Sequence, residues 1–216
     1  MGPMRMDTEA SKLLMLFNWM SPTFPIGGFA YSHGLEQAIA DSAVHTAQDV
    51  ESWIGDLLQS GSAWNDAVLF AQCWHSDVND LALALAGSSE RYQETTQLGR
   101  NFNIASNIWL GTELSDSDVA YPVAAARACV HAKIDKTQAL LAFLQGFAAA
   151  QVSVAVRLVP LGQTKGLQAL RNLSPIIEKV AGRAVTARLD DLGSNCILAD
   201  IAAMKHETLE PRVFRT

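Results

Sequence analysis

The chain has 216 residues, of which 49% are hydrophobic and 18% are charged, and its formal net charge at pH 7 is −6. This composition supports a sizeable buried core and excludes a largely disordered chain, and the acidic balance argues against nonspecific binding of nucleic acid. Three cysteines without a repeated spacing and an N-terminus without a signal-peptide pattern fit a single domain, residues 1–216, in a reducing cytoplasm.

Apolar residues recur at helical spacing along nearly the whole chain. The clearest amphipathic pattern joins Val50, Trp53, Ile54, Leu57 and Leu58. Helices are expected over residues 9–20, about 50–58, 64–71, 81–86, 90–110, 122–132, 137–156 and 164–181, the last of these stopped by Gly182. A final helix, capped by Ser194, carries Ile197, Leu198, Ile201 and Met204 as its apolar residues. Since no segment alternates in the manner of a strand, the expected fold class is all-α.

Residues 137–156 carry no charge over 20 positions, between Lys136 and Arg157. That length also suits a transmembrane helix. However, the segment is rich in alanine and contains Gln145, Gln151 and Ser153. We therefore interpret it as the central buried helix of a single-domain helical bundle, with no membrane involved.

The stretch SPTFPIGGFAYSHGLEQAI, residues 21–39, is a shaped loop between two helices. Pro22 and Pro25 fix φ and withhold backbone donors, so the preceding helix cannot continue through them. Gly27 and Gly28 allow positive φ or the close approach of another backbone. A plain connection between helices needs only a few residues. The length and composition of this loop therefore indicate a binding role.

No catalytic arrangement is evident in the sequence. The five histidines are scattered and form no HExxH pair, and no phosphate-binding loop or G-x-S-x-G motif is present. Two weaker alternatives are a metal site at Cys73 and His75, against ordinary burial of Cys73, and a nucleophile and base among Tyr31, Ser32 and His33. We expect a non-catalytic protein without a cofactor or a metal site.

The chain ends in KHETLEPRVFRT, residues 205–216. Pro211 prevents the last helix from continuing, so few intrachain contacts are expected for the residues near the end. We expect a mobile tail over about residues 207–216, as well as a mobile N-terminal segment over about residues 1–8. A frayed end is one interpretation of Arg212, Phe214 and Arg215. The other is a partner contact, because interfaces are enriched in aromatic residues and arginine.

These patterns closely resemble those of the UreF family of urease accessory proteins. The family's signature loop is matched by Ser21, Pro22, Pro25, Gly27, Phe29, Tyr31, Ser32, Gly34, Leu35 and Glu36. Its terminal pattern is matched by His206, Glu207, Arg212, Phe214 and Arg215, and its Pro-Leu-Gly-Gln turn by Pro160 to Gln163. Gly28 departs mildly, since many members carry Ala or another small residue there.

The resemblance implies an all-α, usually dimeric cytoplasmic protein with no established catalytic activity. Such proteins bridge UreD (also called UreH) and the GTPase UreG, in a complex that helps to deliver Ni²⁺ to apo-urease. The residues expected to bind partners are Phe29, Tyr31, Ser32, His33, Glu36, His206, Glu207, Arg212, Phe214 and Arg215. Among them, Phe29 and Tyr31 are expected as aromatic anchors on a loop that the prolines stiffen. The turns are expected at Pro22, Pro25, Gly27, Gly28, Gly34, Pro160 and Gly162.

Two alternatives remain open at this point. The chain can act as a regulator of GTP hydrolysis by UreG, through an arginine supplied in trans or by control of its timing. Arg100 and Arg157 are on expected helices, and neither stands in a loop shaped like an arginine finger. It can also be a helical domain that binds a small molecule around Trp19, Trp53 or Trp64.

Overall fold

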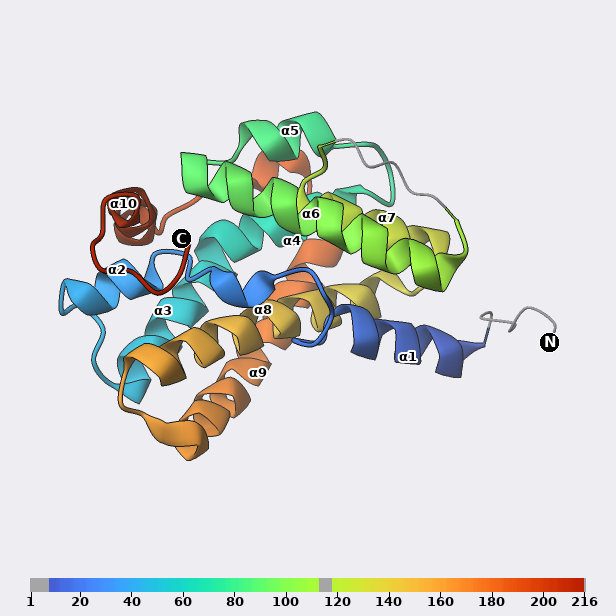
Figure 1. Cartoon of the computed structure of the whole chain (residues 1–216). Helices are drawn as coiled ribbons and strands as arrows, with labels where there is room; N and C mark the ends of the chain where they lie inside the picture. Colours follow the sequence, from blue (N-terminus) through green and yellow to red (C-terminus); the bar gives the residue numbers. More distant parts are fainter. Residues whose placement is uncertain (1–7, 113–117, 216) are drawn as a thin grey trace.

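The structure is a computed structural model that describes residues 8–112 and 118–215. Its helices are α1 (Glu9–Trp19), α2 (Leu35–Ala40), α3 (Ala47–Ser60), α4 (Ser62–Gln72), α5 (Asn79–Ala84), α6 (Ser89–Leu110), α7 (Tyr121–His131), α8 (Lys136–Leu158), α9 (Gly162–Thr186) and α10 (Ile197–His206), with 3₁₀ turns η1 (Gly28–Ala30) and η2 (Leu189–Asp191). No strand occurs in these two ranges, which confirms the all-α class (Figure 1). The N-terminal segment expected to be mobile lies outside the described residues, apart from Thr8, which caps α1.

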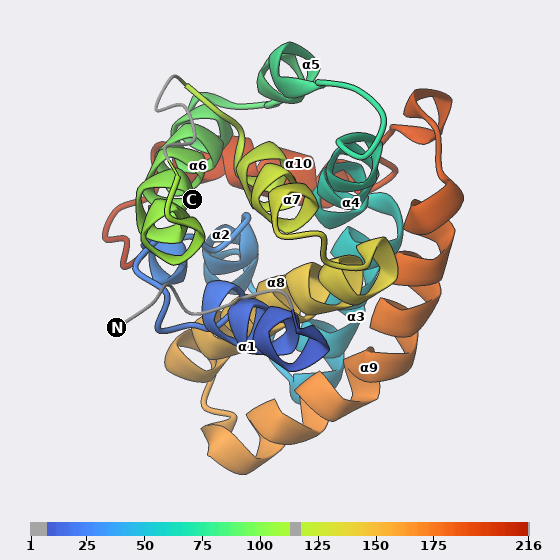
Figure 2. The ribbon, with the colours of Figure 1, turned by 90° about the vertical axis from the view of Figure 1, so that its right-hand side faces the viewer.

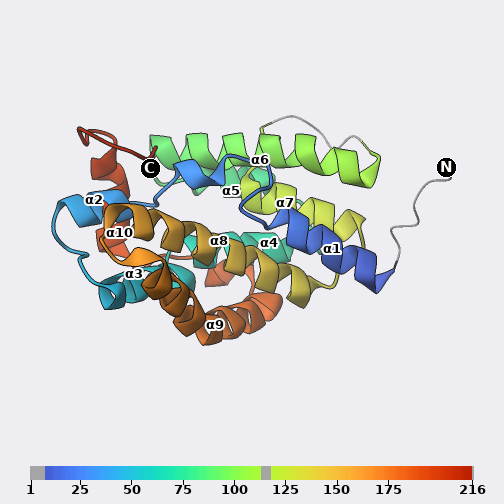
Figure 3. The same cartoon turned by 60° about the horizontal axis from the view of Figure 1, so that its bottom comes forward.

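Helix α8 is the centre of the fold. It contacts α9, α4, α2, α3, α7, α1 and η1, and it runs through the middle of the molecule (Figures 1 and 3). It is the one described helix whose length and composition would also suit a membrane span, and half of its most apolar window is buried inside the protein. These contacts on many sides agree with the expected central core helix.

A tight turn reverses the chain from α8 into α9, which then packs against α8 and α3 (Figure 2). Pro160 follows α8, and Gly162 begins α9 with a φ of 72°, a value that favours glycine. The expected stop at Gly182 is wrong, because α9 continues to Thr186. Ala181 and Ala184 are fully buried on either side of this glycine, so packing against the core outweighs its low helix propensity.

Candidate partner-binding site

The signature loop leaves α1 and folds over the core before it enters α2. Phe24 is buried between the two prolines, and its ring centroid lies 5.3 Å from that of Phe102 on α6. Gly27, at a φ of 85°, precedes the short turn η1. Tyr31 and Ser32, which follow this turn, are buried in the core. The loop is therefore anchored by its own apolar residues rather than projecting into solvent.

Gly34 explains how α10 can pack directly on this loop. Its φ is 76°, and a Cβ atom placed there would lie 2.8 Å from the backbone nitrogen of Ala203 and 3.0 Å from the carbonyl oxygen of Ala199. The buried face of α10 consists of small residues, Ala199, Ala202 and Ala203, together with His206. A glycine against an alanine face brings the two backbones close together.

Glu36, at the start of α2, binds the C-terminal tail. The backbone N–H of Val213 donates to its Oε1 atom at 2.7 Å, and that of Phe214 donates to its Oε2 atom at 2.9 Å. The Oε2 atom also lies 2.9 Å from Nε2 of His206. One buried carboxylate thus connects α2, the end of α10 and the tail.

A second carboxylate completes this arrangement from α6. Glu90 places Oε2 3.0 Å from Nδ1 of His206, and its other oxygen pairs with the guanidinium of Arg212. His206 is fully buried, with one ring nitrogen toward each carboxylate. Each carboxylate therefore has one ring nitrogen of His206 within hydrogen-bond distance. We call Glu36, Glu90, His206, Arg212 and Phe214 the tail cluster.

The tail therefore has many contacts within the chain, and the expectation of few such contacts is wrong. The Phe214 side chain is only 4% exposed, and the backbone N–H of Arg215 donates to the carbonyl of Ala30 at 2.6 Å. The guanidinium of Arg215 and the hydroxyl of Tyr31 both donate to Oε1 of Gln97. The last described residues of the tail accordingly lie beside η1 and α6, and these contacts remove the basis on which the tail was expected to be mobile.

On its other side, the signature loop joins a buried ionic cluster. Nε2 of His33 lies 2.9 Å from one oxygen of Glu94, and the guanidinium of Arg91 lies 2.9 Å from the other. A second nitrogen of Arg91 lies 3.3 Å from Asp66 on α4. His33 itself has a positive φ of 52°, which a residue with a side chain rarely adopts. We call His33, Asp66, Arg91 and Glu94 the ionic cluster.

The pKa values of the two carboxyls of the ionic cluster are shifted in opposite directions. Burial by itself raises the pKa of Glu94, but the charges of Arg91 and His33 and their hydrogen bonds outweigh it, so the pKa falls to about 2. Burial also raises the pKa of Asp66, and there the attraction to Arg91 and His33 does not fully offset it. Asp66 is therefore the less well compensated of the two carboxylates.

The expected partner-binding residues thus divide by exposure. Glu207, Arg212 and Arg215 are exposed, and Phe29 and His33 are half-buried. The others, Tyr31, Ser32, Glu36, His206 and Phe214, are buried within the chain, and in this conformation their side chains contact the protein itself. Tyr31, Ser32 and His33 also bind different groups, respectively Gln97, the backbone N–H of Glu36, and Glu94.

The residues that bind these motifs from elsewhere in the chain have no sequence pattern that indicates this role. Glu90, Arg91, Glu94 and Gln97 lie on one helix, α6, and Asp66 lies on α4. Helical spacing groups the α6 residues, but nothing in the sequence connects them to the tail or to the signature loop. Only the packed fold brings these segments together.

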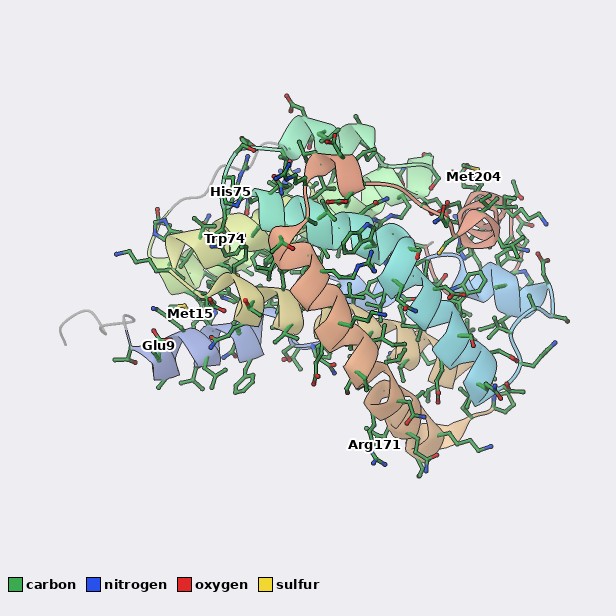
Figure 4. The ribbon with its side chains drawn as sticks, turned by 180° about the vertical axis from the view of Figure 1, so that it is seen from behind. Glu9, Met15, Trp74, His75, Arg171 and Met204 are labelled. Carbon is green, nitrogen blue, oxygen red and sulfur yellow. The ribbon has the colours of Figure 1, made fainter. Side chains whose placement is uncertain are left out.

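Helix α10 turns its large apolar side chains away from the protein. Ile197 is 66% exposed and Leu198 is 78% exposed, and Ile201 and Met204 are also exposed. Met204 lies at the outer edge of α10 in Figure 4 and lines a groove of about 210 Å³ with Leu85, which is itself exposed.

The expected N-terminal cap of α10 is wrong, because Cys196 occupies the cap position and the hydroxyl of Ser194 binds Asp200.

No described residues, within 8–112 and 118–215, group three or more His, Cys, Asp or Glu side chains so that they could hold a metal ion. Cys73 donates to the carbonyl of Leu69, and burial raises the pKa of its thiol to about 12. A thiol held in its protonated form is a poor metal ligand.

Comparison with known proteins covers both the helical core and these terminal motifs. The family model described as UreF matches residues 44–174. Urease accessory protein UreF of Rhizobium leguminosarum bv. viciae is 46% identical over an alignment that covers 99% of this chain and 100% of that relative. Proteins of the same name from Agrobacterium fabrum and Ruegeria pomeroyi are 41% and 40% identical, with 99% and 98% of this chain and 100% of each relative aligned. The chain therefore belongs to the UreF family of urease accessory proteins.

Proposed function

We propose that this protein is a non-catalytic, chaperone-like adaptor that bridges UreD and the GTPase UreG during delivery of Ni²⁺ to apo-urease in the cytoplasm. Nickel is the cargo of this assembly, and we do not assign a nickel site to this chain. The proposal rests on family membership together with surfaces that are suited to protein partners.

The observation that carries the proposal is the inverted packing of α10. This helix buries alanines and exposes Ile197, Leu198, Ile201 and Met204. Contiguous exposed apolar side chains of this kind mark protein interaction sites. Through His206, the tail cluster holds the end of α10 against α2 and α6. Arg212 and Arg215 of the tail are exposed as well. We assign this surface, which we call the α10 face, to UreD.

A second apolar surface supports self-association. Leu14 and Phe17 on α1 and Ile104 and Ile108 on α6 are exposed, and these two helices pack together. An uncharged apolar surface is complementary to itself, as a twofold dimer interface requires. We assign this surface to the homodimer. Phe17→Asp is therefore expected to shift the mass measured by light scattering from that of a dimer to that of a monomer.

Co-expression with UreD and UreG tests the bridging role. A tagged chain is expected to retain both partners, and Leu198→Asp is expected to lose UreD and with it the nickel-dependent activation of urease. Leu167→Asp is the matched control, because Leu167 is a leucine on α9 with 69% exposure. Equal recovery of UreD with both variants would reject the α10 face, and failure of the unmodified chain to retain either partner would reject the adaptor role.

A further inference from the structure

A cavity of about 80 Å³ lies behind the signature loop. Met20 at the end of α1 and Pro22 and Phe29 of the loop form one side, Phe147 of α8 forms another, and the ionic cluster forms the floor. Trp19 also lines it, whereas the indole of Trp64 donates to the carbonyl of Asp191 elsewhere. The loop residues that identify the family are thus also the wall of a cavity with apolar sides and a charged floor.

The floor of the cavity leaves the carboxylate of Asp66 incompletely compensated. It holds two carboxylates, Asp66 and Glu94, against one guanidinium, Arg91, and the imidazole of His33. Among the described residues, Arg91 is the one hydrogen-bond donor to Asp66, and its guanidinium also forms an ion pair with Glu94. An anion placed here would face two carboxylates while the one guanidinium is already engaged, which excludes phosphates and carboxylates as ligands.

The walls suit a planar cation on an apolar stem. Guanidinium groups stack on aromatic rings, form paired hydrogen bonds with carboxylates and are less strongly hydrated than ammonium groups. One wall residue already shows this contact, because the guanidinium of Arg157 lies 5.9 Å from the ring centroid of Phe29. Arg157 is not among the residues that line the cavity.

We propose that this cavity receives the side chain of an arginine from a protein partner, with its guanidinium beside Asp66 and its stem against Phe29 and Phe147. About 80 Å³ has room for two or three waters, or for one guanidinium group, and not for a nucleotide. The assignment to a protein partner rests on the proposed adaptor function. The affinity of the cavity for a guanidinium does not depend on that function.

Two small probes of matched shape test the chemistry on the full chain. Propylguanidinium and its uncharged counterpart propylurea are titrated separately, and binding is followed by NMR at the indole N–H of Trp19. The charged probe is expected to bind at least tenfold more tightly. Equal affinity for the two probes, or perturbation by neither, would overturn the proposal.

Variants then locate the site. Asp66→Asn is expected to abolish the preference for the charged probe, whereas Asp80→Asn, an exposed aspartate on α5, is expected to keep it. If Asp66→Asn does not fold, Phe29→Leu at the half-buried wall is expected to weaken propylguanidinium binding several-fold. An unchanged preference in folded Asp66→Asn, or unchanged propylguanidinium affinity in Phe29→Leu, would overturn the assignment.

The source of the guanidinium is decided with the assembled complex. A chain in complex with UreD and UreG is expected to lose propylguanidinium binding, because a partner arginine fills the cavity. Full probe binding by the complex would overturn the partner assignment and leave free guanidino compounds as the ligands. Failure of the adaptor role is a separate result, because in that case the chain retains no partner and no complex forms.

Discussion

Replacing Glu36 by alanine removes the carboxylate on which the tail cluster depends. The change leaves the N–H groups of Val213 and Phe214 and one ring nitrogen of His206 without their acceptor. A buried donor left unpaired costs about 1–3 kcal/mol, and loss of one partner of a buried charged pair costs about 3–5 kcal/mol. Because one carboxylate makes all three contacts, the costs overlap, and we expect a loss of about 3–5 kcal/mol in the free energy of unfolding.

Urea denaturation followed by circular dichroism measures this loss. Glu207→Ala is the matched control, since Glu207 is an exposed carboxylate of the same terminal motif, and it is expected to change stability by less than about 0.5 kcal/mol. Combining Glu36→Ala with deletion of residues 212–216 is expected to cost less than the sum of the two changes, because both remove the same contacts. Equal stability of the Glu36 and Glu207 variants would refute the assignment of Glu36 as the acceptor for the tail.

Three further changes probe other parts of the structure. Phe214→Ala is expected to lower the free energy of unfolding by about 3 kcal/mol, as measured in urea, because its ring is buried, and an unchanged value would mean that the tail does not pack as described. Gly34→Ala is expected to disturb α10, because its Cβ would lie 2.8 Å from a backbone atom, so hydrogen exchange in α10 should accelerate, while Gly182→Ala, with open space around it, should not have this effect. Because the pKa of Glu94 is lowered to about 2, its stabilisation, about 3 kcal/mol, is present above the ordinary value near 4.3 and is lost as the pH falls toward 2. Stability measured between pH 5 and 2 should therefore fall less steeply for Glu94→Gln, and identical slopes would contradict the lowered pKa.

Local sequence patterns were sufficient for most helices of this fold. The pattern from Val50 to Leu58 lies within α3, and the uncharged run flanked by Lys136 and Arg157 lies within α8. These elements are predictable because their periodicity directly reflects the face that they bury. The end of α9 is not, since burial of Ala181 and Ala184 carries the helix past Gly182. At Gly182, burial of the neighbouring alanines therefore outweighs the low helix propensity of glycine.

The candidate site was predictable only in its linear motifs. Pro22, Pro25 and Gly27 indicate a shaped loop, but the sequence does not reveal that Glu36 accepts hydrogen bonds from residues about 177 positions later. The exposure of the apolar residues of α10 could not be predicted for a related reason. Periodicity shows that a helix has an apolar side, but it does not distinguish a core face from a surface that awaits a partner.

Burial of the motif residues changes how their substitution should be interpreted. Glu36, His206 and Phe214 lie inside the chain, and they hold the tail and the base of α10 in place. If the α10 face binds UreD, as we propose, their substitution weakens binding indirectly, through loss of the position of α10. Substitutions at Leu198 or Ile201 remove the contact itself and leave the fold intact. The two mechanisms separate with temperature, because binding by the Glu36 or Phe214 variants should recover when the folded state is repopulated on cooling, whereas binding by the Leu198 variant should not.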